Sequence, residues 1–233
     1  MLHNLIQHKY KLAILLLLMA ASVVSFLLAD ARMAYSNSQD YSALTFNLEL
    51  AWIPFIFASI AYAVSWSRKL LYLVVPVCAF VWLIFFPNAP YILTDFQHLN
   101  TNATNAPLWY DVLMLVWFAW TGLLLGVVSL YLMQEIVTRA FGRVTGWLFT
   151  IAVTFLSSFG IFLGRFYRWN SWDILGDPMP IAHDIWGFLR HPFANLRVYG
   201  FTLLFTLLFL FVYLAIHAFG RVMQEEQFED KAG

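Results

Sequence analysis

Six apolar runs, each long enough to cross a bilayer as a helix, constrain this chain more than any other feature. They cover residues 12–29, 48–66, 70–86, 112–133, 144–163 and 198–219. A helix crossing about 30 Å of hydrocarbon needs roughly 20 residues, because the backbone must satisfy its own hydrogen bonds there. Only 11% of the 233 residues are charged, against about 25% in soluble domains. The sequence therefore predicts an all-α polytopic membrane protein, a six-helix transmembrane bundle with two ordered extracytoplasmic loops.

The first run could be either a membrane anchor or a removable signal. Lys9 and Lys11 precede it, and Ala29-Asp30-Ala31 resembles a signal peptidase site. Because its 18 residues suit a full crossing, we expect an uncleaved signal anchor. We expect one six-span domain over residues 1–223 and a solvated acidic cytoplasmic tail over 224–233.

The distribution of Lys and Arg predicts the orientation, because short cytoplasmic loops carry an excess of both. With the amino terminus in the cytoplasm, the inner segments hold eight of the thirteen: Lys9, Lys11, Arg68, Lys69, Arg139, Arg143, Arg221 and Lys231. The outer segments hold the other five, with Arg32 in the first loop and Arg165, Arg168, Arg190 and Arg197 around the last. Both termini are then cytoplasmic.

Several classes of chemistry lack their sequence signatures. Thirteen basic residues balance thirteen acidic ones, so no net basic charge favours a nucleic-acid partner. There is no Walker loop and no dinucleotide fingerprint, so we expect no nucleotide partner. The single cysteine, Cys78, permits no intrachain disulfide and no thiolate cluster. The sequence assigns no cofactor.

The first chemically rich outer segment starts with the string FPNAPYILTDFQHL, residues 86–99. Pro87 and Pro90 are expected to end the third helix, with the residue before each proline extended. The Asn- and Thr-rich residues 100–105 predict a loop.

Within this first string, Asp95 and His98 have the spacing of one helical face. If Thr94 caps a short helix, the carboxylate can orient the imidazole, or both can hold a metal. A simpler alternative is an Asp–His hydrogen bond that only pins the loop.

The second outer segment, residues 164–197, starts with the string GRFYRWNSWD. Arg165 and Arg168 share a helical face if the fifth helix continues past Gly164. An Arg at membrane depth is usually retained beside an anion, a carbonyl or a water-filled cavity. The two arginines either lock the outer loops through carboxylates or receive an anionic group such as a lipid phosphate. The carboxylates on the same predicted face are Glu49, Asp95, Asp111, Asp173, Asp177 and Asp184.

Two further histidines, His183 and His191, share this outer face with His98. Together with the carboxylates they could form a zinc site with an open position. Their spacing matches no compact ligand motif, however, and we predict no metal site.

We predict that the two outer segments close over one polar pocket. Its acid-base or orienting groups would be Asp95, His98 and His183, and its anion-binding groups Arg165 and Arg168. The other pocket residues would be Asn88, Tyr91, Trp169, Asn170, Trp172 and Asp173. The tryptophans suit the head-group level, where the amphipathic indole is favoured.

The strings 86–99 and 164–173 resemble the bacterial membrane family catalogued as domain of unknown function 1361. The resemblance extends from the second span to the sixth. It implies a multi-pass protein of the bacterial inner membrane, and it implies no activity or substrate.

Three functions are compatible with these features. The leading hypothesis is that the protein binds or modifies an anionic amphiphile or lipid head group in the outer leaflet, with membrane lipid as the partner. A small transporter or channel with Glu49 at its entrance is the second, although the inner halves of the spans offer few polar groups. The third is a non-catalytic subunit that stabilises a membrane-protein partner.

Overall fold

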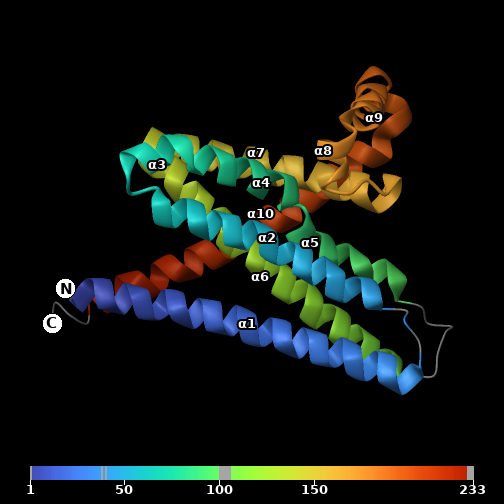
Figure 1. The fold of residues 1–233 in the computed structure, drawn as a ribbon, viewed down its shortest axis with the longest axis horizontal. Helices are drawn as coiled ribbons and strands as arrows, with labels where there is room; N and C mark the ends of the chain where they lie inside the picture. The colour runs from blue at the N-terminus through green and yellow to red at the C-terminus, as the bar shows by residue number, and fades with distance from the viewer. Residues whose placement is uncertain (1, 38, 40, 100–105, 230–233) are drawn as a thin grey trace. The chain divides into compact units, whose positions relative to one another are not determined.

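The computed structural model describes residues 2–37, 39, 41–99 and 106–229; of residues 2–10 and 221–229 it describes the backbone alone. The described residues form helices and turns and no strand (Figure 1). Six helical runs among them are long and apolar enough to cross a membrane. These runs are Lys11–Ser36, Ser42–Val64, Val75–His98, Leu108–Phe141, Arg143–Tyr167 and Pro192–Gly220. Each overlaps one predicted run, so the prediction of an all-α polytopic bundle is confirmed.

The chain divides into two compact units, Met1–Met133 and Gln134–Gly233, called unit 1 and unit 2 below. Unit 1 contains α1 (Leu2–Ser36), α2 (Ser42–Val64), α3 (Arg68–Leu73), α4 (Val75–Phe85), α5 (Asn88–Tyr91), the 3₁₀ helix η1 (Ile92–His98) and most of α6 (Leu108–Phe141). Unit 2 contains the end of α6, α7 (Arg143–Phe162), the π-helical turn η2 (Leu163–Tyr167), α8 (Asp173–Gly176), α9 (Pro178–Arg190), the 3₁₀ helix η3 (Pro192–Asn195) and α10 (Leu196–Glu229).

In unit 1, α1 and α6 run antiparallel. The indole Nε1 of Trp117 donates to the carbonyl of Ala21 at 2.9 Å, and the hydroxyl of Tyr110 donates to the carbonyl of Leu28 at 2.9 Å. Seven residues forward along α1 thus correspond to seven residues back along α6. This register brings the carboxyl end of α1 to the amino end of α6.

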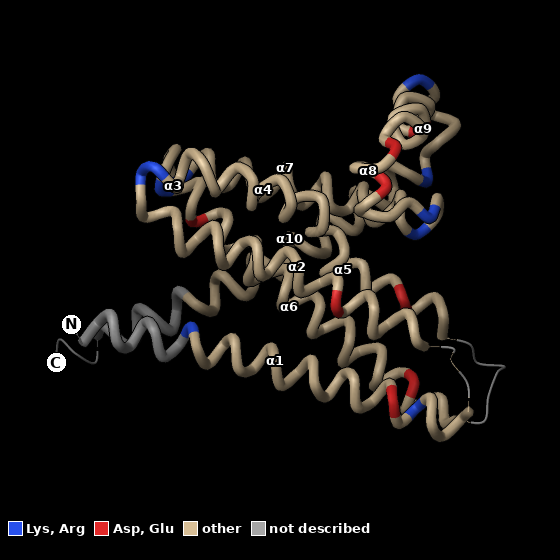
Figure 2. The backbone as a smooth tube through the Cα atoms, viewed as in Figure 1, with Lys and Arg blue, Asp and Glu red and all other residues tan. Residues whose placement is uncertain are grey.

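The charged residues of the spans lie near helix ends. α4 contains no charged residue, and in α6 a long uncharged stretch separates Asp111 near one end from Glu135 near the other (Figure 2). This distribution is expected for helices in hydrocarbon, where a charge costs several kcal/mol on insertion scales.

The residues before Pro87 and Pro90 were expected to be extended, and this expectation is wrong: the chain stays helical there. α4 does end at Phe85, but Phe86 has φ −56° and ψ −38°, and Ala89 lies inside α5. A proline near a helix start removes only a donor that would lack an intrahelical partner anyway. The side-chain amide of Asn88 also donates to the carbonyl of Phe85 at 2.9 Å. The first string therefore continues as short helices that prolong the third span to His98.

Gly122 on α6 lets the first string pack closely against that helix. A Cβ at this position would lie 2.6 Å from the carbonyl oxygen of Ala89 and 2.8 Å from Cδ1 of Ile92. Real Cβ contacts are not that short. The absence of a side chain at residue 122 thus sets the depth at which α5 and η1 lie in unit 1.

In unit 2, α7 and α10 run antiparallel and α9 packs beside one end of the pair. The ring centroids of Phe162 and Phe201 are 5.7 Å apart at that end, and those of Trp147 and Tyr213 are 6.2 Å apart at the other. The ring of Phe188 on α9 lies 6.3 Å from that of Phe162. α9 is thereby held against the ends of both spanning helices.

Two predictions fall partly or wholly outside the described residues. The predicted loop at residues 100–105 is one of them. The predicted acidic tail is the other: α10 continues as a helix to Glu229, inside the tail, and residues 230–233 are not described.

Candidate functional site

Asp95 and His98 lie on one face of η1, as their spacing predicted. Asp95 is 3% exposed, and its Oδ2 accepts a hydrogen bond from Nδ2 of Asn47 on α2 at 3.0 Å. Nε2 of His98 lies 4.0 Å from Oδ1 of Asp95, a charge-pair distance rather than a hydrogen bond. The His98 side chain is 57% exposed. A buried carboxylate, fixed by an amide, therefore lies beside an accessible imidazole.

Thr94 does not cap this helix, since Tyr91 occupies the N-cap position of η1. The hydroxyl of Thr94 donates to the carbonyl of Tyr91 at 2.7 Å, one turn back, and the helical path already starts at Asn88. Asn88 and Tyr91, both predicted pocket residues, are half-buried. The amide of Asn88 helps to hold the α4–α5 junction, as described above.

In unit 2, Arg165 and Arg168 do not lie on one α-helical face, because the helical path ends between them. The helix widens into a π turn from Leu163 to Tyr167, and Arg168 then has φ +59°, in the left-handed region. The α-helical continuation that would place both arginines on one face is therefore absent. Arg165 is half-buried and Arg168 is exposed. Single π turns and left-handed non-glycine residues are enriched at functional sites.

The carboxylates of the second outer segment accept hydrogen bonds from uncharged groups. These pairs are Asp173 with the backbone N–H and side-chain amide of Asn170 (2.7 and 3.1 Å), Asp177 with the backbone N–H of Met179 (3.4 Å), and Asp184 with Nε1 of Trp169 (2.9 Å). Asp177 is thereby the N-cap of α9. The acids thus shape their own loop.

Two arginines of the same segment lie over aromatic rings. The guanidinium of Arg197 is 4.2 Å from the ring centroid of Phe166, and that of Arg190 is 5.7 Å from the ring centroid of Trp186. Among the described residues of unit 2, no ion pair joins Arg168, Arg190 or Arg197 to a carboxylate. This arrangement argues against a lock in which Arg168 is neutralised by the acids of its own segment.

Sequence reasoning missed a buried ion pair of unit 1, Arg32 with Asp111. The Nε and Nη2 atoms of Arg32 lie 2.5 and 3.1 Å from the two carboxylate oxygens of Asp111. The hydroxyl of Tyr41 donates to the same carboxylate at 3.2 Å. Both charged side chains are at most 3% exposed. Such a bidentate pair has the strongest geometry available to an arginine and a carboxylate.

The expected position of Arg32 in the first outer loop is therefore wrong. Hydropathy falls after Ala29, but α1 continues to Ser36 because Asp111 neutralises the arginine inside the fold. From the sequence, Asp111 is a candidate partner for the arginines of the last loop, whereas the structure pairs it with Arg32. The sequence signal for this pair was one arginine, Arg32, after the first predicted span and one aspartate, Asp111, at the outer end of the fourth.

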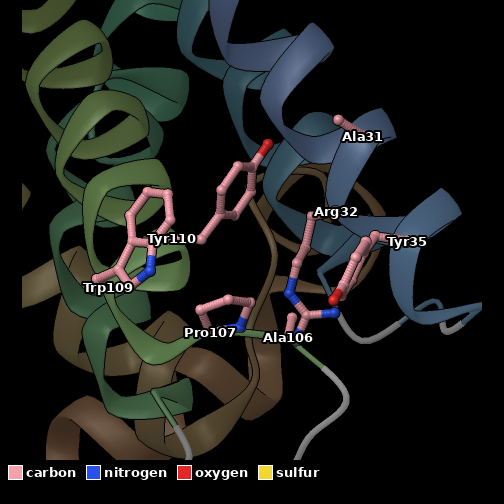
Figure 3. A pocket seen from close by; sticks show the side chains of 7 residues that line it. All are labelled: Ala31, Arg32, Tyr35, Ala106, Pro107, Trp109 and Tyr110. Carbon is pink, nitrogen blue, oxygen red and sulfur yellow. The ribbon is translucent and has the colours of Figure 1, made fainter.

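A cavity of about 290 Å³ lies beside this ion pair (Figure 3). Its wall comes from the last turns of α1 and from the residues before and at the start of α6: Ala31, Arg32, Tyr35, Ala106, Pro107, Trp109 and Tyr110. The wall is mainly apolar and aromatic. No pattern in the sequence predicted this cavity.

The predicted pocket combines residues of both units. Asp95, His98, Asn88 and Tyr91 belong to unit 1, whereas Arg165, Arg168 and the remaining pocket residues, including His183 on α9, belong to unit 2. A pocket shared by the two units stays a prediction. In the described part of the chain, no group of three or more His, Cys, Asp or Glu side chains is arranged to hold a metal ion.

Comparison with known families finds a match over most of the chain. A family model described as Protein of unknown function (DUF1361) matches residues 46–212. The chain belongs to this family. The DUF1361 match covers the site residues from Asn47 to Arg197, whereas Arg32 precedes the matched range. No curated protein and no solved structure matches the chain.

Proposed function

We propose that the protein binds the anionic head group of a membrane amphiphile through unit 2, with Arg168 as the principal contact and Arg165 nearby. The main support is that the carboxylates of Asp173, Asp177 and Asp184 accept hydrogen bonds from uncharged donors. A guanidinium presents a planar fork that suits phosphate or carboxylate oxygens. At a membrane surface, a lipid head group supplies such oxygens.

The local backbone supports this role for Arg168. A left-handed conformation at a non-glycine residue costs on the order of 1 kcal/mol or more and persists only where the surroundings impose it. Here the π turn before Arg168 and the Asn170–Asp173 turn after it impose that conformation. The helical path of α7 therefore ends at Arg168 before any ligand binds.

Neighbouring aromatic residues fit a position at the head-group level. Trp169 is half-buried and is fixed by its bond to Asp184, and Trp172 is 43% exposed. Indole rings are enriched at this level because they combine an apolar body with a polar N–H group.

Binding of a short-chain phosphatidylglycerol to the purified protein in detergent tests the proposal. We expect Arg168→Gln to weaken binding by about tenfold, as for the loss of one charge-assisted contact, and Arg168→Lys to restore only part of it because the fork is missing. Arg139→Gln is the matched control, since Arg139 lies on α6 and pairs with Glu135. Short-chain phosphatidylcholine and inorganic phosphate distinguish head-group recognition from general phosphate binding.

Equal affinity of the wild type and Arg168→Gln, with both proteins folded, would refute the proposal. Equal loss in the Arg139 control would show that only net charge matters, which also contradicts it.

A second candidate function is acid–base modification of such an amphiphile by His98. Its specific support is the buried Asp95 carboxylate, which Asn47 holds and which lies beside the exposed imidazole. A carboxylate in that place can help to orient an imidazole for acid–base chemistry. Incubation with bacterial lipid extract, followed by mass spectrometry, is expected to give a product with the wild type and with Arg139→Gln but none with His98→Gln. Absence of any product with the wild type would exclude this candidate for the lipids in the extract.

A further inference from the structure

α9 has an exposed apolar side that the packing of unit 2 leaves uncovered. Its inner side consists of the buried Ile181 and Phe188, which pack against Phe162 and its neighbours. Next to that side, Met179, Trp186 and Leu189 are 73%, 57% and 61% exposed. At about 100° per residue, these three positions fall within roughly 80° of one another on the helix.

The remaining side of α9 is polar. His183 and Arg190 border the exposed apolar side, and Asp184 lies beyond them next to the buried side. The helix therefore has three sides: one on the protein, one apolar and uncovered, one polar. A helix that only covered a soluble core would have a polar surface opposite its buried side.

The uncovered apolar surface continues into a spanning helix. Phe193 on η3 is 88% exposed, and Leu196 at the start of α10 is 65% exposed. The candidate span Pro192–Gly220 includes both residues, and farther along it Leu203 and Leu204 are 54% and 71% exposed. Exposed leucines in the middle of a spanning helix face lipid.

We infer that α9 is an interfacial helix whose Met179, Trp186 and Leu189 side is inserted into the membrane leaflet at the α7–α10 connection. Both ends of α9 are tied to spanning helices, within 16 residues of Phe162 and six residues of Leu196. Its apolar side is therefore held near the membrane surface, next to lipid-facing α10. Helices of this kind bury their apolar face about 5–10 Å into the boundary between head groups and acyl chains.

Arg190 fits the boundary of such an insertion. Its guanidinium lies over the ring of Trp186, 5.7 Å from the centroid, at the edge between the apolar and polar sides. Arginine and tryptophan side chains both favour the level where hydrocarbon meets head groups. This insertion is independent of anion binding at Arg168 and goes beyond that proposal.

Fluorescence quenching in vesicles tests the insertion. In a variant lacking the native cysteine, Leu189→Cys and Phe193→Cys each carry an environment-sensitive fluorophore, and the full-length protein is reconstituted into phosphatidylcholine vesicles. Phe193 is 88% exposed, so its replacement removes little packing. His183→Cys, on the polar side of the same helix, is the matched control. Vesicles with nitroxide-labelled acyl chains report lipid contact, and aqueous iodide reports contact with water.

We expect the nitroxide lipid to quench residues 189 and 193 at least about twofold more than residue 183, and iodide to show the reverse order. Equal iodide quenching at all three positions would overturn the inference. Protection of residues 189 and 193 from both quenchers would also overturn it, because a protein surface rather than lipid would then cover this side.

Discussion

Removing one partner of the Arg32–Asp111 pair is expected to destabilise the protein strongly. Both side chains are at most 3% exposed, so either single substitution leaves a buried charge without its partner. Such losses cost about 3–5 kcal/mol in protein interiors. Asp111→Leu also removes the acceptor of the Tyr41 hydroxyl, a hydrogen bond to a charged group worth about 1.5–3 kcal/mol. We therefore expect Asp111→Leu to be at least as destabilising as Arg32→Met.

The double variant, Arg32→Met with Asp111→Leu, separates charge compensation from packing. Buried ion pairs replaced by apolar residues of similar volume often lose little stability. We expect the double variant to be at least about 2 kcal/mol more stable than Asp111→Leu alone. The free energy of unfolding can be measured in mixed micelles by titration with sodium dodecyl sulfate, with far-UV circular dichroism as the signal.

The exposed Arg139–Glu135 pair on α6 is the control for this cycle. Its atoms are 3.8 Å apart, and its side chains are 27% and 38% exposed. Surface ion pairs four residues apart contribute about 0.3–0.5 kcal/mol. Arg139→Met and Glu135→Leu are therefore expected to change the free energy of unfolding little. The reasoning fails if either Arg32 or Asp111 single variant costs less than about 1 kcal/mol, or if the double variant costs the sum of both.

Two further outcomes follow from the geometry and the topology. Gly122→Ala is expected to lower the free energy of unfolding by about 1–3 kcal/mol, because its Cβ would lie 2.6 Å from the Ala89 carbonyl oxygen. Gly200→Ala is the control and is not expected to destabilise the protein, since no atom lies within 4 Å of its Cβ. Equal stability of the two variants would contradict the close packing of α5 on α6. Cysteines placed at Gln97 and Asn170, in a chain without the native cysteine, are both expected to react with an impermeant maleimide added from the extracytoplasmic side, and labelling from opposite sides would refute the predicted topology.

The helical path around the first string was only partly predictable. The spacing of Asp95 and His98 gave their common face, because side chains three residues apart meet in any helix. The geometry at Pro87 and Pro90 did not follow the sequence rule for residues that precede proline. Packing of Ala89 against Gly122 and the bond from Asn88 to Phe85 outweigh a local preference for extended backbone.

The pairing of charges was predicted less well than their location. The sequence placed Asp111 at the end of the fourth span, and the structure pairs it with Arg32. Many combinations of outer acids and arginines satisfy the same topology. Distance and direction select among them, and both depend on the register of α1 against α6.

The sequence by itself determined that the described part of this chain holds six helices long and apolar enough to cross a membrane, because the lengths of apolar runs and the need to satisfy backbone hydrogen bonds leave few alternatives. Tertiary structure alone decided that Arg32 is buried on Asp111, that the acids of the last loop bind Asn170, Met179 and Trp169, and that one apolar side of α9 stays uncovered. Hydropathy acts along the chain and is readable residue by residue. Partner choice depends on which side chains of distant segments meet, and that is fixed only when the helices pack.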